Sequence, residues 1–359
     1  MRPSVSFRHL ARMTDDTGLL EHSLGSVPRR KEGYSTDDQA RALWACLEWL
    51  EWVEDEQSRS ELFRLMEIYL SFLLWVQKED GHFHNNISYD RKEEAEEPSD
   101  DCLGRCLWAC AVGLARLQED RYRLALNEIV HKALPQISRL RYSRGIAYAL
   151  AGLSLLIAEQ GRNELRAAAE TLAGRLADRY RYHRKPDWRW YEPMMAYSNG
   201  VIPWGLLWAY DSLEKPEWLD IALESLDFLI EVSMNENRQI RPIGNRGWHK
   251  PGVGRALWDQ QPIDVMKLAL AAAKAYELTG SETYKSVVGK CRDWFYGEND
   301  LGIFMVDPDD GSCCDGLCEH DANLNRGAES TLSFLITEAL YIKLLRVKRR
   351  SMHVAASSR

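Results

Sequence analysis

Apolar residues recur at three-to-four spacing along most of the chain, while alternating runs bounded by turn residues are almost absent. This pattern predicts an all-α protein. Six segments combine a polar or turn-like start with a helix too rich in Ala, Gly, Leu, Cys and Trp to face water. They begin at Ser35, Ser99, Ser143, Ser198, Asp259 and Asn325. Each predicts a helix that is buried on all sides.

Between these segments lie more ordinary amphipathic helices with one charged face. We expect them at residues 59–77, 120–138, 163–181, 215–233 and 281–296, with a weaker one before residue 23. Six buried helices alternating with six half-solvated ones predict an (α/α)6 toroid, in which an inner ring is surrounded by an outer ring. We expect one domain over residues 1–345 and a basic, flexible tail over 346–359. An open helical solenoid is the main alternative.

The inner helices of such a ring run parallel, so their positive N-terminal ends gather at one mouth. Three long connections, at residues 78–98, 234–258 and 297–324, lead to the same rim. Loops of this length in a compact domain are usually functional or mobile. The sequence therefore predicts a binding site at this mouth.

Charge and composition narrow the class of ligand. The net charge of −8 argues against a nucleic acid partner, no stretch is apolar enough for a membrane span, and the N-terminus lacks a signal-like segment. The cysteines also lie in patterns that fit helical cores. Together these observations favour a cytoplasmic protein. Thirteen Trp and fifteen Tyr residues are many for this length. They suit either stacking on sugar rings or the filling of a large core.

Pairs of carboxylates stand at the heads of two buried helices. Asp37 and Asp38 lie within a sequence where Thr36 and Gln39 match a capping box, and Asp100 and Asp101 follow Ser99. Capping alone explains one acidic residue in a first turn. The second favours a catalytic or sugar-binding role in the shared mouth.

Two aromatic and amide-rich motifs offer further contacts. Trp190 and Tyr191 directly precede Glu192, whose aromatic neighbours favour a raised pKa and an acid role. Trp258 and Asp259 precede the pair Gln260 and Gln261, whose amides can donate to and accept from sugar hydroxyls. Packing in the core is the alternative for both motifs.

A third motif contains three cysteines, Cys313, Cys314 and Cys318, close to His320. Their spacing matches no familiar closed zinc site, so we expect no metal, and nothing in the sequence requires an organic cofactor. Glu329 lies in the first turns of the last buried helix and is expected to face the mouth.

The chain contains the blocks DDQARAL, DQQP and NRGAESTL. Through these blocks, and over the segments between Gly33 and Leu340, it resembles a family of bacterial (α/α)6 proteins described as glycoside hydrolase-like or glycosyltransferase-associated. The chain departs from that pattern at Gln39 and Tyr191, where the family has Asn and Phe. The fold is similar to that of unsaturated glucuronyl hydrolases, acylglucosamine epimerases and inverting glycosidases. The resemblance implies site residues at Asp37, Asp38, Asp101, Arg105, Glu192, Asn199, Asp259, Gln260, Gln261, Asp315, Asn325 and Glu329.

These observations favour an inverting glycoside hydrolase acting on an oligosaccharide, in which an acid and a base lie roughly 6.5–9.5 Å apart. Glu192 or Asp101 is the expected acid and Asp38 or Asp259 the expected base. The substrate-binding residues are expected to be Asp37, Arg105, Trp190, Tyr191, Asn199, Trp258, Gln260, Gln261, Asp315, Asn325 and Glu329.

Two other functions fit the same mouth. A sugar epimerase or isomerase commonly uses histidine, and only His249 and His320 lie on plausible mouth loops. A non-catalytic carbohydrate-binding partner of a glycosyltransferase would need the aromatic surface without paired acids.

Overall fold

The computed structural model describes the backbone of residues 5–357 and the side chains up to residue 346. Over this range the chain forms twelve α-helices and four two-stranded antiparallel ladders. The inner helices are α2 (Thr36–Trp49), α4 (Asp100–Arg116), α6 (Ser143–Gln160), α8 (Val201–Leu213), α10 (Pro262–Thr279) and α12 (Ala328–Ser357). The outer helices are α1 (Arg8–Met13), α3 (Glu56–Val76), α5 (Asp120–Ala133), α7 (Arg166–His183), α9 (Pro216–Val232) and α11 (Glu282–Phe295).

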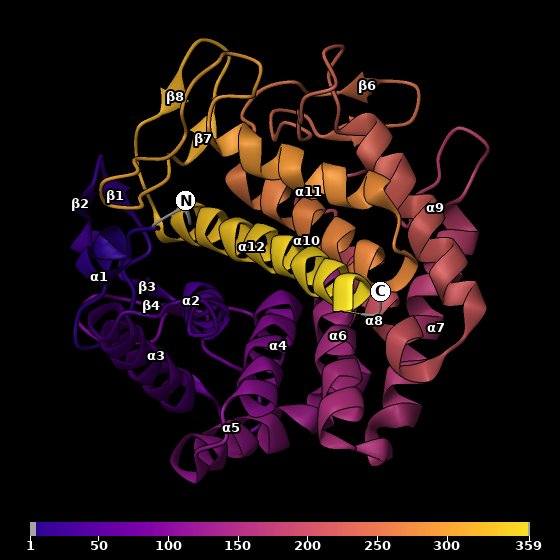
Figure 1. Ribbon diagram of the computed structural model, residues 1–359. Helices are drawn as coiled ribbons and strands as arrows, with labels where there is room; N and C mark the ends of the chain where they lie inside the picture. Colours follow the sequence, from indigo (N-terminus) through magenta and orange to yellow (C-terminus); the bar gives the residue numbers. More distant parts are fainter. Residues whose placement is uncertain (1–4, 358–359) are drawn as a thin grey trace.

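The inner helices form a closed ring. Each contacts the next in the order α2, α4, α6, α8, α10 and α12, and α12 contacts α2 again. Outer helices pack against the inner helices that precede them, as Figure 1 shows for α3, α5, α7, α9 and α11 on the outside of the ring. The predicted (α/α)6 toroid is thus confirmed, and closure excludes the open solenoid.

Burial explains the composition of the inner helices. In α4 and α6 nearly every side chain is buried, including residues on opposite faces of each helix. Small residues let the two backbones approach closely, because a Cβ on Gly104 would lie 2.5 Å from the carbonyl oxygen of Gly145. The outer helices bury only one face each.

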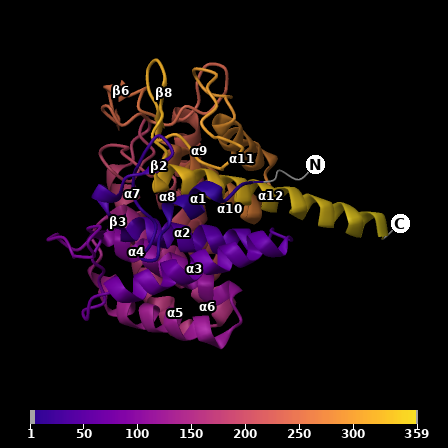
Figure 2. The same ribbon diagram turned by 90° about the vertical axis from the view of Figure 1, so that its left-hand side faces the viewer.

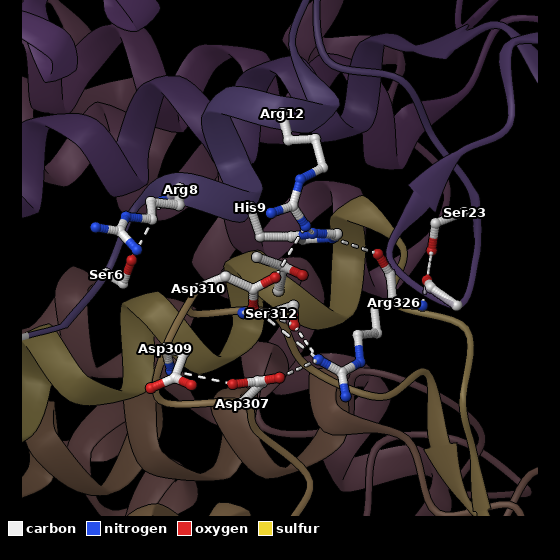
Figure 3. Close-up of polar contacts among 12 residues, drawn as sticks. Ser6, Arg8, His9, Arg12, Ser23, Asp307, Asp309, Asp310, Ser312 and Arg326 are labelled. Atoms are coloured by element: carbon white, nitrogen blue, oxygen red, sulfur yellow. Dashed lines mark hydrogen bonds and ion pairs between the residues drawn. The ribbon is translucent and has the colours of Figure 1, made fainter.

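The ring is closed by the two ends of the chain. The sixth outer partner, α1, has only six residues and lies against α12. Figure 3 shows the polar cluster that joins it to the loop before α12: His9 Nε2 donates to the carbonyl of Arg326 (2.8 Å), and Arg12 pairs with Asp310 (2.9 Å). The guanidinium of Arg326 in turn pairs with Asp307 (3.1 Å). These contacts hold α1 against the ring although the helix has only six residues.

The expected capping box does not form. Ser35, not Thr36, is the N-cap of α2, and its side chain makes no capping hydrogen bond. The Gln39 amide instead donates to the carbonyl of Leu19 and accepts from its N–H, both at 2.8 Å. Because a buried amide must find partners, this side chain ties the N-terminal segment to the ring.

The ladders are the hairpins β1–β2 (Ser23–Leu24, Val27–Pro28), β5–β6 (His249–Lys250, Gly254–Arg255) and β7–β8 (Gly316–Leu317, Ala322–Asn323), and the long-range pair β3–β4 (Tyr34–Ser35, Asn86–Ile87). Single backbone bridges also join Met195 to His249 and Gln260 to Leu317. Main-chain pairing therefore connects the loop before α2 with the loop before α4, and the loops before α8, α10 and α12 with one another. These loops form an ordered rim at the end of the ring where the inner helices begin.

Helix α12 runs away from that rim, and its C-terminal end projects on the opposite side in Figure 2. The expected tail of residues 346–359 falls within its last turns and beyond, where side chains from residue 347 lie outside the described residues. The division at residue 345 stays a prediction. Over the described residues, every helix is too short or too polar to cross a bilayer.

Candidate functional site

A cavity of about 640 Å³ opens at the rim where the inner helices begin. A smaller chamber of about 300 Å³ adjoins it, and both are lined by Asp37, Arg41, Gln261 and Glu329. These residues come from the first turns of α2 and α12 and from the residue before α10. The site thus has two compartments that meet at a junction formed by three inner helices.

An ion-pair network crosses this junction. Arg41, one turn after Asp38 on α2, contacts Asp38 Oδ1 at 2.5 Å and Glu329 Oε2 at 2.7 Å. Arg105 of α4 pairs with Asp37. Both guanidinium groups are almost fully buried, whereas the Glu329 side chain is 40% exposed. Glu329 is therefore the most accessible carboxylate of this network.

Burial controls the protonation of two carboxyl groups near the junction. It raises the pKa of Asp38 to about 7, against the opposing charge of Arg41, with Glu329 adding to the rise. The pKa of Asp264 on α10 also rises to about 7, again mainly through burial. Each carboxyl group can therefore exchange a proton near neutral pH.

The amine of Lys267 on α10 lies against side chains of α2 and α6. It is fully buried, and its Nζ lies over the rings of Tyr148 (5.0 Å) and Trp44 (5.4 Å). Burial, followed by the charges of Arg105 and Arg41, lowers its pKa well below the usual value. Burial therefore disfavours the charged form of this amine.

The wall contributed by α4, α6 and the loop before α8 is held by a second set of contacts. Tyr197 donates to Asp101 Oδ2 at 2.7 Å, and the Arg144 guanidinium lies over the Tyr197 ring at 4.5 Å. Arg144 also pairs with Glu192 at 3.2 Å. Asp100 accepts hydrogen bonds from the backbone N–H groups of Arg141 and Tyr142, so its role is to hold the turn before α6.

The structure brings eight of the predicted site residues to the two compartments. They are Asp37, Asp101, Arg105, Glu192, Gln261 and Glu329 in the main cavity, and Asp38 and Asp315 in the smaller chamber. They come from five separate segments of the sequence, 37–38, 101–105, 192, 261 and 315–329, as the predicted common mouth requires.

Three predicted ligand contacts lie behind the cavity wall. Trp190 and Tyr191 are fully buried, and the Tyr191 hydroxyl contacts Ser225 Oγ at 2.8 Å. Gln260 is also fully buried, and its amide donates to the carbonyl of Leu257 and to Asp300. In this conformation these side chains support the site and cannot touch a ligand, because they are fully buried.

Four further residues line neither compartment: Asn199, Trp258, Asp259 and Asn325. Asp259 has a left-handed backbone (φ 58°) and pairs with Arg246 at 2.6 Å. Asn325 accepts from the N–H of Gly25, and Asn199 donates to the carbonyl of Ala196. Each of these three groups organises a loop of the rim.

Several lining residues were missed by the sequence reasoning. Arg41 and Arg144 carry the ion pairs, and Trp248 and Tyr197 supply aromatic surface. Arg41 could have been found, since it follows Asp38 by one helical turn. Arg144 is the second residue of a buried helix, where a charge needs a partner.

The histidines expected for proton abstraction lie away from the main cavity. His249 packs against Trp188 (5.1 Å between ring centres), and His320 is exposed. A different histidine, His22, lines the smaller chamber with its Nε2 3.5 Å from Glu21. Among the described residues, no group of three or more His, Cys, Asp or Glu is arranged to hold a metal ion.

No protein-family model matches the chain, and no curated protein matches it in sequence. Solved structures do match in fold. Cellobiose 2-epimerase from Bacillus thermoamylovorans B4167 superposes with a TM-score of 0.73 at 9% identity, over 94% of this chain and 96% of that one. The chain has the toroid fold of these proteins.

Two α-mannanases of the GH76 family share this fold as well. The enzyme BT2949 from Bacteroides thetaiotaomicron gives a TM-score of 0.68 at 11% identity, over 95% of both chains. An α-1,6-mannanase from Salegentibacter sp. HEL1_6 gives 0.62 at 12% identity, over 93% of this chain and 95% of that one. That structure is an inactive variant with two consecutive aspartates changed to alanine, in complex with α-1,6-mannotetrose.

Proposed function

We propose that the protein is a glycoside hydrolase that cleaves an oligosaccharide by the inverting mechanism. The observation that carries this proposal is the junction, where Arg41 bridges the buried Asp38 and the accessible Glu329 between two compartments. Inverting hydrolysis needs one carboxyl group that donates a proton and one carboxylate that activates water. The junction offers one candidate for each.

In this proposal Asp38 is the acid and Glu329 the base. A pKa of about 7 leaves Asp38 largely protonated below neutrality, so it can protonate the leaving oxygen. This reverses the base role expected for Asp38 from the sequence. Asp37, paired with Arg105, and Asp101, bonded to Tyr197, would bind hydroxyls of the sugar. The mannanase that is inactive with two consecutive aspartates changed makes consecutive aspartates candidates for function, and this chain has two such pairs, Asp37–Asp38 and Asp100–Asp101.

A sugar epimerase is the second candidate. The epimerase likeness and the His22–Glu21 pair in the smaller chamber favour it, because removal of a proton beside a carbonyl needs a base such as histidine. Exchange of substrate hydrogen with deuterated water, lost in His22→Gln, would support this function.

A cytoplasmic location, and association with a glycosyltransferase as a binding partner, stay predictions from the sequence.

The deciding experiment incubates purified protein with α- and β-linked manno-, gluco- and galacto-oligosaccharides and follows released sugars by chromatography. We expect release from at least one substrate and a loss of about 10²- to 10⁴-fold in Glu329→Gln, the range typical of general acid–base groups. Asp120→Asn, an exposed first-turn carboxylate of the outer helix α5, is the matched control and should keep full activity.

Two outcomes would argue against hydrolysis. Conversion without release of a smaller sugar would move the proposal to an epimerase. Binding without any conversion, unchanged in Glu329→Gln, would indicate a carbohydrate-binding protein.

A further inference from the structure

A second cavity, of about 470 Å³, lies at the opposite end of the ring. Its lining comes from all six inner helices, including Trp108 of α4, Glu159 of α6 and Trp208 of α8. The C-terminal end of α12 leaves the ring on this side (Figure 2). The volume falls within the roughly 300–1,000 Å³ typical of small-molecule sites.

Four indole rings gather at this cavity. Trp108 lies 4.6 Å from Trp204 and 5.5 Å from Trp208 between ring centres, and Trp44 lies 5.6 Å from Trp108. All four line the cavity together with aliphatic side chains such as Leu155. Such rings offer apolar faces on which the C–H groups of a sugar can stack.

Two of these indoles carry N–H groups without a partner. The Nε1 atoms of Trp108 and Trp208 are buried and make no hydrogen bond, whereas Nε1 of Trp44 donates to Glu48 at 2.9 Å. Trp108 is only 4% exposed. A buried donor without an acceptor costs about 1–3 kcal/mol. A ligand that brings acceptor oxygens to this cavity would remove that cost.

The cationic side chains that line the cavity are already paired with carboxylates. Arg116 contacts Glu48 at 2.7 Å, Lys343 contacts Glu277 at 2.6 Å, and Lys274 contacts Asp211 at 2.7 Å. Nζ of Lys274 also lies 3.6 Å from the centre of the Trp208 ring, so the cation site on that ring is occupied by the protein itself. The paired cations therefore need no anion from a ligand, and the Trp208 ring needs no cation.

We propose that this cavity is a second binding site for a neutral, polyhydroxylated ligand, a sugar unit, separate from the mouth at which we place catalysis. Sugar hydroxyls would accept from the N–H groups of Trp108 and Trp208 and donate to Glu159, for which the structure gives no ion pair. The ring faces would cover the apolar side of the sugar. The site does not depend on hydrolysis at the other end.

The test observes the indole N–H groups directly by NMR, on protein labelled with ¹⁵N in tryptophan. The signals of Trp108 and Trp208 are assigned by their loss in Trp108→Phe and Trp208→Phe, which keep an aromatic ring and remove the donor. We expect cellobiose or α-1,6-mannobiose at tens of millimolar to shift both signals with one common Kd. The signal of Trp75, half-exposed on α3, should stay in place.

The variants give the second measurement. We expect Trp208→Phe to raise this Kd about threefold to tenfold, the loss that corresponds to one net hydrogen bond, and Trp75→Phe to leave it unchanged. Because Trp208 is less buried than Trp108, its variant keeps the test valid if Trp108→Phe unfolds. Signals that do not move with either sugar, or a Kd unaffected by Trp208→Phe, would overturn the proposal. Neither readout depends on turnover at the Asp38 site.

Discussion

Asp38→Asn is expected to lower turnover about 10²- to 10⁴-fold, the usual contribution of a general acid. The wild-type protein should lose kcat/KM as the pH rises through about 7, because the proton on Asp38 that the leaving oxygen needs is then released. The asparagine variant cannot supply that proton, so its residual activity should not follow this alkaline limb. The measurement is a pH profile of both proteins on the best substrate of the panel.

Asp264 provides the control for this profile, since burial raises its pKa to about 7 as well. Asp264 lines neither compartment of the site. Asp264→Asn should therefore keep the alkaline limb that Asp38→Asn loses. If the limb disappears with Asp264 and survives in Asp38→Asn, the acid has been assigned to the wrong carboxyl group.

The same pKa shift has a consequence for stability. The pKa of Asp38 is higher in the folded protein than the value of 3.8 expected for an unfolded chain. Its contribution to stability is therefore full below about pH 4 and is lost as the pH rises through about 7. A buried carboxyl group with a pKa raised in this way is typical of a functional site.

The inner helices could be predicted from the sequence because complete burial restricts composition. The segments expected from Ser99 and Ser143 begin as helices at Asp100 and Ser143, and their Ala, Gly and Cys residues fill the ring's interior. Helix α1 could not be predicted well. Its six residues depend on contacts with Asp310 and Arg326, which lie about three hundred residues away along the chain.

The acidic side of the site was also accessible to sequence reasoning, because helix heads identify which carboxylates share a mouth. The aromatic side was not. Trp190 and Tyr191 have the composition of a stacking surface but are core residues, while Trp248 and Tyr197 line the cavity. Aromatic side chains satisfy both environments, so only the path of the loops decides which of them a ligand can reach.

Gly145→Ala should both destabilise the protein and weaken its activity. A Cβ at residue 145 would lie 2.5 Å from the carbonyl oxygen of Asp100 and 2.6 Å from its carbonyl carbon, so α6 and α4 would have to separate. Overpacking of this kind costs about 1–3 kcal/mol. The displacement falls at the first turn of α4, which carries Asp101. The temperature of thermal unfolding and the turnover rate should therefore both decline.

Gly174→Ala is the matched control for this close approach. Gly174 also lies inside a helix, α7, but a Cβ there would meet nothing within 4 Å. Since Ala restricts the unfolded chain more than Gly, this variant should be neutral or stabilised by about 0.4–1 kcal/mol, with activity unchanged. Equal effects of the two substitutions would mean that helix propensity, rather than the contact between α4 and α6, accounts for the result. A stable Gly145→Ala protein with full activity would show that Asp101 does not depend on that contact for its position.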